Sequence, residues 1–98
     1  MYIVRDIFNL KYGHFRPVKA LMEEAMKKGM MPNAKSRRVL SDFTGEYYRL
    51  IMETGFDTLA DFEKEFSTDM SNLDWQDWYK KFTEHVEGGQ REILKVVI

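Results

Sequence analysis

The spacing of apolar residues changes several times along the chain, and the order of these changes limits the fold more than any other feature of the sequence. Residues 2–11 mix aromatic and β-branched side chains as strands do, and residues 17–28 carry apolar side chains at helical spacing. Residues 36–53 have the pattern of a β-hairpin, residues 58–86 are again helical, and residues 91–98 are typical of a last strand. The predicted order is strand, helix, strand, strand, helix, strand.

Polar residues and glycines mark where the second helical region is expected to begin and end. Thr58 and Asp61 have the spacing of a variant capping box, in which the first side chain accepts a hydrogen bond from the N–H three residues later. Ser71 and Asp74 repeat this spacing and offer a second start within the region. The two glycines at 88–89 are expected to end it, because glycine is the commonest residue just beyond a helix.

An order of this kind has few ways to fold. Right-handed crossovers bring the four strands into one antiparallel sheet and place both helices on one face. We therefore predict a ferredoxin-like βαββαβ fold of the α+β class. The chain has 98 residues and no repeat or low-complexity segment, which indicates a single domain over residues 1–98.

The hairpin carries charges in a stretch that is otherwise apolar, VLSDFTGEYYRLIMET at residues 39–54. A two-residue turn at Thr44-Gly45 or at Gly45-Glu46 divides its side chains between the two faces in the same way, whereas a three-residue loop would exchange the faces. With a two-residue turn, one face collects Arg37, Val39, Ser41, Tyr48, Leu50 and Met52. The other face collects Arg38, Leu40, Asp42, Tyr47, Arg49, Ile51 and Glu53.

The more apolar of these two rows is assigned to the helices, and the mixed row then lies on the open face of the sheet. On the mixed row the carboxylates of Asp42 and Glu53 can neutralise the guanidinium groups of Arg38 and Arg49 across the strands. Two interpretations of this row stay open. It lines a small cavity with polar ends, or it carries interface salt bridges and edge-strand charges that discourage aggregation.

Both faces of the sheet carry apolar side chains, although the helices cover only one of them. On the first strand Ile3 and Ile7 alternate with a second apolar row, and the last strand is apolar on both parities between Ile93 and Ile98. A solvated face would instead alternate cleanly between apolar and polar residues. We therefore expect a partner on the open face, and the simplest one is a second copy in a symmetric homodimer.

Composition excludes several classes of function. The chain has 15 basic and 16 acidic residues, so it lacks the positive charge that nucleic-acid binding requires. It has no cysteine and no HExxH-like motif, so we expect no metal site, and no cofactor is expected either. No apolar run approaches the roughly 20 residues that cross a bilayer, so no membrane contact is expected. The N-terminus lacks a signal-peptide pattern, and a cytoplasmic protein is expected.

Short stretches spread over the chain occur in a recognisable order. They are FNLKYGHF at residues 8–15, SDFTG at 41–45, METGFDTLADFEK at 52–64, WQDWYKKF at 75–82 and REILKVV at 91–97. Together they resemble the NIPSNAP-like family, in which similar stretches connect strand one to the first helix, form the hairpin and enter the second helix. The resemblance covers nearly the whole chain and implies the dimeric α+β barrel fold, but it implies no particular reaction.

The superfamily that this resemblance implies includes several enzymes. They are cofactor-free monooxygenases, haem-degrading monooxygenases, muconolactone-type isomerases and polyketide cyclases, with ligands between the sheet and the helices or in the barrel. The haem-degrading enzymes use an Asn on strand one, a Trp on strand three and a His late in the second helix. Asn9 and His85 stand at matching places, but the Trp position falls near Met52, so the set is incomplete.

Seven side chains are candidates for a site. His85 could act as a general acid or base, and Tyr47 could donate a hydrogen bond to a substrate carbonyl, which makes these two the catalytic candidates. Each candidate also has a structural interpretation, because a helix C-terminus favours a histidine cation and aromatic residues pack helices onto sheets. Met30 and Met31 flank a turn and could shape a pocket rim. The ligand-binding candidates are Asn9, His14, Arg38, Arg49 and Trp75.

Two functions follow from these observations. The first is a homodimeric NIPSNAP-like protein that binds a small hydrophobic or aromatic molecule or has a structural role, without catalysis. The alternative is a cofactor-independent monooxygenase, isomerase or cyclase that acts on a small aromatic or hydrophobic acid in a pocket between sheet and helices. A pocket that holds His85 or Tyr47 together with Arg38 or Arg49 would favour the enzyme.

Overall fold

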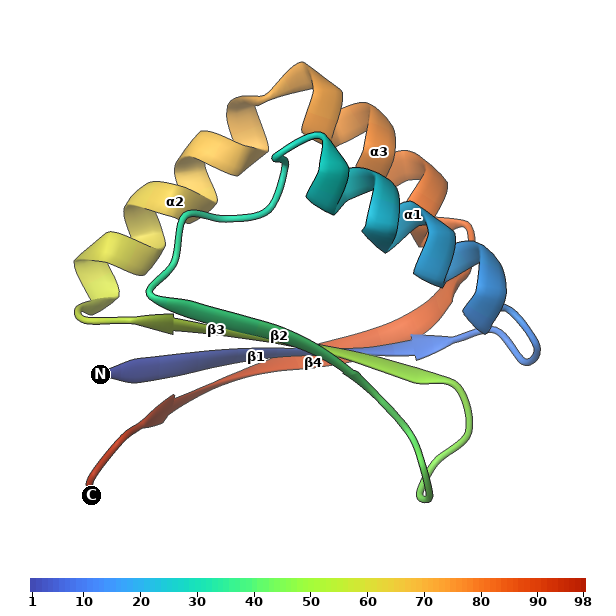
Figure 1. The fold of residues 1–98 in the computed structure, drawn as a ribbon, viewed down its shortest axis with the longest axis horizontal. Coiled ribbons are helices and arrows are strands. Elements are labelled where there is room, and N and C mark those ends of the chain that lie inside the picture. The colour runs from blue at the N-terminus through green and yellow to red at the C-terminus, as the bar shows by residue number, and fades with distance from the viewer.

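The computed structural model describes residues 1–98 and contains one sheet covered on one face by helices (Figure 1). The strands pair antiparallel in the order β2-β3-β1-β4, which is the sheet of a ferredoxin-like α+β fold and confirms the predicted class. No helix is long and apolar enough to cross a membrane. The elements are β1 (Tyr2–Leu10), α1 (Phe15–Lys27), β2 (Ser36–Ser41), β3 (Arg49–Phe56), α2 (Leu59–Ser71), α3 (Leu73–Thr83) and β4 (Val86–Lys95).

The second helical region consists of two helices that meet at an angle over the sheet (Figure 1). The predicted cap of the first one is confirmed, since Thr58 Oγ1 accepts a hydrogen bond from the Asp61 N–H at 3.1 Å. The predicted second start at Ser71 is wrong by one residue. Asn72 has extended backbone angles and its Oδ1 accepts from the Trp75 N–H at 3.1 Å, so asparagine, which caps as well as serine, starts α3.

The two glycines that were expected to end the helical region lie inside β4 instead. Helix α3 already ends at Thr83, and Gly88 and Gly89 pair with β1. The physical reason is a close approach of the two strands. A Cβ atom on Gly89 would lie 2.3 Å from the carbonyl oxygen of Ile7, so this position of the sheet requires a residue without a side chain.

Because β4 starts earlier than expected, the predicted bounds of the last strand and the predicted place of His85 are both wrong. The last strand runs over Val86–Lys95 rather than residues 91–98, and Val96 adds one further bond from its N–H to the carbonyl of Met1 at 2.9 Å. His85 was expected on the helix, but it lies in the turn between α3 and β4. Its backbone N–H donates to the carbonyl of Phe82 at 3.0 Å, which closes this turn.

The connection between β2 and β3 is longer than the predicted two-residue turn. It spans residues 42–48, and Tyr48 adopts a left-handed φ of 59°. The Asp42 carboxylate explains the open loop, because it accepts hydrogen bonds from the backbone N–H of Arg49 at 3.2 Å and from its side-chain Nε at 2.9 Å. These bonds replace the hydrogen bonds between the two backbones that would otherwise continue the pairing of β2 with β3 toward the turn.

The register of the hairpin nevertheless agrees with the prediction. Ser41 pairs with Leu50, as a turn at Gly45-Glu46 requires, so the side chains divide between the faces as expected. The apolar row of β3 faces the helices, and Leu50 is 2% exposed. The core cluster on this face consists of Leu10, Val18, Met22, Leu50 and Phe82.

Candidate functional site

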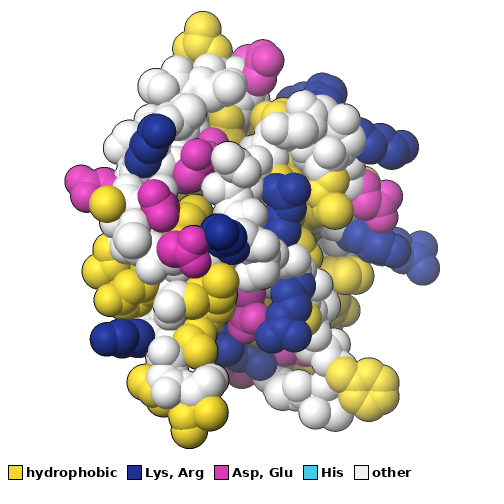
Figure 2. All heavy atoms as spheres, turned by 60° about the vertical axis from the view of Figure 1, so that its left-hand side comes forward, with side chains coloured by type: hydrophobic (Ala, Val, Ile, Leu, Met, Phe, Trp, Pro, Cys, Tyr) yellow, Lys and Arg dark blue, Asp and Glu magenta, His cyan; other side chains and the backbone are white.

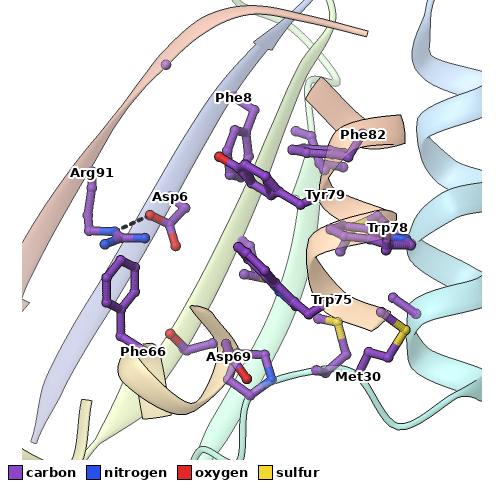
Figure 3. Close-up of a pocket in the computed structure, with 18 of the residues that line it drawn as sticks. Asp6, Phe8, Met30, Phe66, Asp69, Trp75, Trp78, Tyr79, Phe82 and Arg91 are labelled. Carbon is purple, nitrogen blue, oxygen red and sulfur yellow. Dashed lines mark hydrogen bonds and ion pairs between the residues drawn. The ribbon is translucent and has the colours of Figure 1, made fainter. Parts of the chain in front are cut away.

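The helices do not fill the whole space above the sheet, and a cavity of about 810 Å³ lies between the two layers (Figure 3). β1, β3 and β4 form its floor, and α1, α2 and α3 contribute to its walls. Of the 28 residues that line it 17 are hydrophobic, and Met30 and Met31 are among them, as the sequence suggested for a pocket rim. Both the volume and the mainly apolar lining are typical of small-molecule sites.

One ion pair lies on the floor of the cavity. Arg91 Nε on β4 donates a hydrogen bond to Asp6 Oδ1 on β1, which is its partner in the strand register (Figure 3). The guanidinium carbon of Arg91 lies 5.5 Å from the ring centroid of Phe62 and 4.9 Å from that of Phe66, both on α2. Two aromatic faces and one carboxylate therefore hold this arginine in place.

The wall formed by α2 carries carboxylates without a cation. Asp69 lines the cavity, and no Lys, Arg or His nitrogen lies within 4.0 Å of its carboxylate. Burial raises the pKa of the Asp69 carboxyl, and the charge of Glu65 one turn earlier raises this pKa further. Glu65 accepts a hydrogen bond from the backbone N–H of Asn33 at 3.2 Å.

The wall formed by α3 is aromatic, and its two tryptophans differ. Trp78 Nε1 donates to the carbonyl of Leu21 at 2.8 Å and so ties α3 to α1. Trp75 stacks on Tyr79 with ring centroids 4.7 Å apart, and its indole N–H donates to no protein acceptor (Figure 3). Trp78 therefore has a structural role, whereas the polar edge of Trp75 is free for a ligand.

Of the seven candidates from the sequence, only Trp75 lines this cavity. Asn9, Arg38 and Arg49 lie on the opposite, open face of the sheet, and Tyr47 is 79% exposed in the loop between β2 and β3. The predicted charge neutralisation is confirmed on that face. Arg49 pairs with Asp42 at 2.9 Å, and Arg38 pairs with a glutamate of β3 at 2.8 Å.

That glutamate, Glu53, lies at the centre of a charged ladder across all four strands. Arg38, Glu53, Arg5 and Glu92 are neighbours in the register, with alternating signs. Both carboxylate oxygens of Glu53 are used, since Oε1 accepts from Arg38 and Oε2 from Arg5. The hydrogen bonds from these arginines lower the pKa of the Glu53 carboxyl, although burial opposes them. Figure 2, which brings forward the side of the molecule with α2 and both chain ends, shows basic and acidic side chains intermixed with hydrophobic ones there.

The two histidines come together at one end of the molecule, outside the cavity lining. His14 precedes α1 and His85 precedes β4, and their Nδ1 atoms are 2.9 Å apart, so one ring donates a hydrogen bond to the other. The backbone N–H of Lys11 also donates to the carbonyl of His85 at 2.8 Å. The pair joins the turn after β1 to the turn after α3.

Sequence reasoning missed several side chains of the cavity. Asp6 carried a usable signal, because it is the only charged residue in the inward row of β1, between Val4 and Phe8. Arg91 lies directly opposite Asp6 but could be found only from the register of β1 with β4. Nothing in the sequence distinguishes Asp69 from the other acidic residues of the helices.

Comparisons with known proteins agree with this fold. No protein-family model matches the chain, and no curated protein sequence matches it significantly. A solved NIPSNAP family protein of unknown function from Agrobacterium tumefaciens superposes with a TM-score of 0.89 at 15% identity, over 98% of this chain and 87% of that one. An uncharacterised NIPSNAP domain protein from Burkholderia xenovorans gives 0.89 at 10% identity, over 99% and 95%.

A further solved structure connects the fold to an enzyme. It is described as an antibiotic biosynthesis monooxygenase, and it gives a TM-score of 0.75 at 12% identity over 100% of both chains. The fold of this chain is thus that of the NIPSNAP proteins and is shared with the monooxygenase, which confirms the ferredoxin-like fold of the chain that the sequence resemblance implied.

Proposed function

We propose that this protein binds a small molecule in the cavity between the helices and the sheet. The observation that carries the proposal is the cavity of about 810 Å³, with a mainly apolar lining and a few polar groups. An apolar cavity weakens a fold because its lining loses packing contacts, and a ligand that fills it restores them. A chain of 98 residues has a modest core, here a cluster of five buried residues, so the packing contacts that a ligand adds matter more than they would in a larger protein.

Binding is preferred to catalysis because the reactive candidates lie elsewhere. An enzyme site was expected to combine His85 or Tyr47 with one of the two arginines of the hairpin. The cavity lining contains none of these candidates, since Arg38 and Arg49 are also absent from it. The solved NIPSNAP protein of the same fold is described as having unknown function, which agrees with a binding role as well as with any other. Trp75 is the candidate that this proposal retains.

We also propose a homodimer through the open face of the sheet. The charged ladder on this face is flanked by apolar side chains, with Ile7 beside Ile51 and Ile3 beside Leu94 in the register. Alternating charges between apolar rows form a surface that a second copy can complement. Light scattering tests this arrangement, and a stable particle of 11.7 kDa at micromolar concentration would contradict it.

The binding proposal is tested by a fluorescence titration with N-phenyl-1-naphthylamine, a neutral aromatic probe. We expect saturable binding to the purified chain and a loss of about fivefold or more in affinity for Trp75→Ala, because the substitution removes a stacking surface worth about 1 kcal/mol. Leu73→Ala is the matched control, since Leu73 lies on the same helix, is 74% exposed and does not line the cavity.

Equal affinity of the two variants would place the probe outside the cavity and contradict the proposal. Native mass spectrometry of the purified chain adds a second measurement, because it reports a co-purified ligand and the number of subunits together.

A further inference from the structure

The charges that line the cavity do not balance. Its ionisable acids are Asp6, Glu65 and Asp69, and its bases are Lys80 and Arg91. Three carboxylates against two cations leave a formal charge of −1 when all are ionised, and the position of each charge matters more than the sum. The position decides which chemical class of ligand the cavity accepts.

The cation on the floor already has a carboxylate partner. The side chain of Arg91 is 40% exposed and that of Asp6 is 12% exposed, and they form an ion pair beneath the rings of Phe62 and Phe66. Only the Nε–H of Arg91 donates to a protein acceptor, but Asp6 already neutralises its charge, and a ligand carboxylate that took over the arginine would leave Asp6 without its partner. Separating such a pair is strongly unfavourable. The floor therefore attracts an acid less strongly than an unpaired arginine would.

The wall formed by α2 differs from the floor, because its charged groups have no partner of opposite sign. Glu65 and Asp69 are one turn apart on α2, both line the cavity, and neither forms an ion pair within 4.0 Å. Like charges at this spacing repel one another. Burial adds to the unfavourable free energy of the ionised Asp69. A cation placed between the two carboxylates would relieve both effects.

Aromatic faces complete the environment of such a cation. Phe66 lies between Glu65 and Asp69 in the sequence and lines the same cavity, and Trp75 contributes an indole ring with a free N–H. Indole is the aromatic ring that attracts cations most strongly. Carboxylates beside aromatic faces are the surroundings that recognise amines.

Resting on the function proposed above, we propose that the ligand is an aromatic or hydrophobic amine. Its protonated nitrogen lies at Glu65 and Asp69 on α2, and its apolar part packs against Trp75 on α3. The aromatic or hydrophobic acid that the sequence suggested as a substrate fits this cavity less well, because Asp6 already neutralises Arg91, and the one other cation of the lining, the exposed Lys80, is outnumbered by the two unpaired carboxylates.

Three indoles of matched shape and different charge test this inference by calorimetry on the full chain. They are tryptamine as the cation, 3-ethylindole as the neutral compound and indole-3-propionate as the anion. We expect tryptamine to bind about tenfold more tightly than 3-ethylindole, which is the effect of about 1.4 kcal/mol from a charge-assisted contact. The anion should bind most weakly.

Two variants locate the cation. Asp69→Asn should weaken tryptamine about fivefold and leave 3-ethylindole unchanged, and Glu65→Gln should act in the same direction if Asp69→Asn fails to fold. Asp77→Asn is the matched control, because Asp77 is an exposed acid of α3 outside the cavity lining. An equal effect of the control variant would show a general charge effect and overturn the assignment to Asp69.

The outcomes separate the two proposals. If 3-ethylindole or indole-3-propionate binds as tightly as tryptamine, the amine inference is overturned while the binding function stands. If none of the indoles binds but N-phenyl-1-naphthylamine does, the amine inference is also overturned. If no probe binds, the binding function itself fails.

Discussion

Replacement of Glu53 by glutamine should destabilise the protein through its charge alone. Glu53 is the buried centre of the ladder on the open face, and its side chain is 8% exposed. Arg5 Nε donates to it at 2.9 Å, and Arg38 donates twice, from Nε at 3.0 Å and from Nη2 at 2.8 Å. Glutamine keeps the shape of the side chain but removes the negative charge that both arginines contact.

The size of the effect follows from the exposure of the two arginines. A hydrogen bond to a charged group contributes about 1.5–3 kcal/mol, whereas an ion pair in solvent contributes about 0–1 kcal/mol. Arg5 is 34% exposed and falls near the first case, and Arg38 is 69% exposed and falls near the second. We therefore expect Glu53→Gln to lower the free energy of unfolding by about 2 kcal/mol at neutral pH.

The shifted pKa of Glu53 determines in which pH range the ion pairs stabilise the fold. The pKa of Glu53 lies below its ordinary value of 4.5 in the folded chain, chiefly because Arg38 hydrogen-bonds to the carboxylate. A lowered pKa means that the ion pairs stabilise the fold fully above pH 4.5, and that this stabilisation is lost as the pH falls through the folded value. The wild type and the variant should converge in that acidic range.

Urea denaturation followed by circular dichroism measures the loss of unfolding free energy at neutral pH and its change with pH. The protein concentration is kept fixed, because the stability of a dimer depends on concentration. Glu46→Gln is the control, since Glu46 is exposed in the loop between β2 and β3 and forms no ion pair. A loss that stays as large after the pH has fallen below the lowered pKa of Glu53 as it is at neutral pH would refute the reasoning, because packing and not charge would then be responsible.

Three further predictions concern the core, the sheet and the cavity. Phe82→Ala should lower the free energy of unfolding by about 3–5 kcal/mol in urea, because the ring is 2% exposed within the core cluster. Gly89→Ala should lower the melting temperature by forcing a Cβ against the Ile7 carbonyl, whereas Gly88→Ala, which meets nothing within 4 Å, should leave it nearly unchanged. Asp69→Asn should raise the melting temperature at neutral pH, because burial raises the carboxyl pKa, and this gain should disappear as the pH falls through the raised value.

Much of the fold could be predicted because it depends on local patterns. The change between strand and helix spacing fixes the element order, and the cap at Thr58 depends on residues three apart. The glycines of β4 show where this fails. Locally they suggest the end of a helix, but the close approach of the Ile7 carbonyl, 82 positions away from Gly89, decides their place.

The candidate site was harder to predict because it combines distant segments. Trp75 could be identified from its aromatic helix, yet the Arg91–Asp6 pair depends on the register of two strands 85 positions apart. His14 and His85 could each be singled out, but their contact depends on how two turns meet. Residue type was visible in the sequence, whereas the pairing of residues across the sheet was not.

The bend at Asn72 has a consequence for how occupancy of the cavity could be detected. Helix α2 on one side of this bend has no fully buried residue, so it should open locally at a fraction of the free energy of global unfolding. Its amide hydrogens then exchange through that local opening. A ligand held against α2 makes the opening less favourable, and each 1.4 kcal/mol slows exchange about tenfold. Hydrogen exchange along residues 59–71 would therefore report a bound ligand residue by residue.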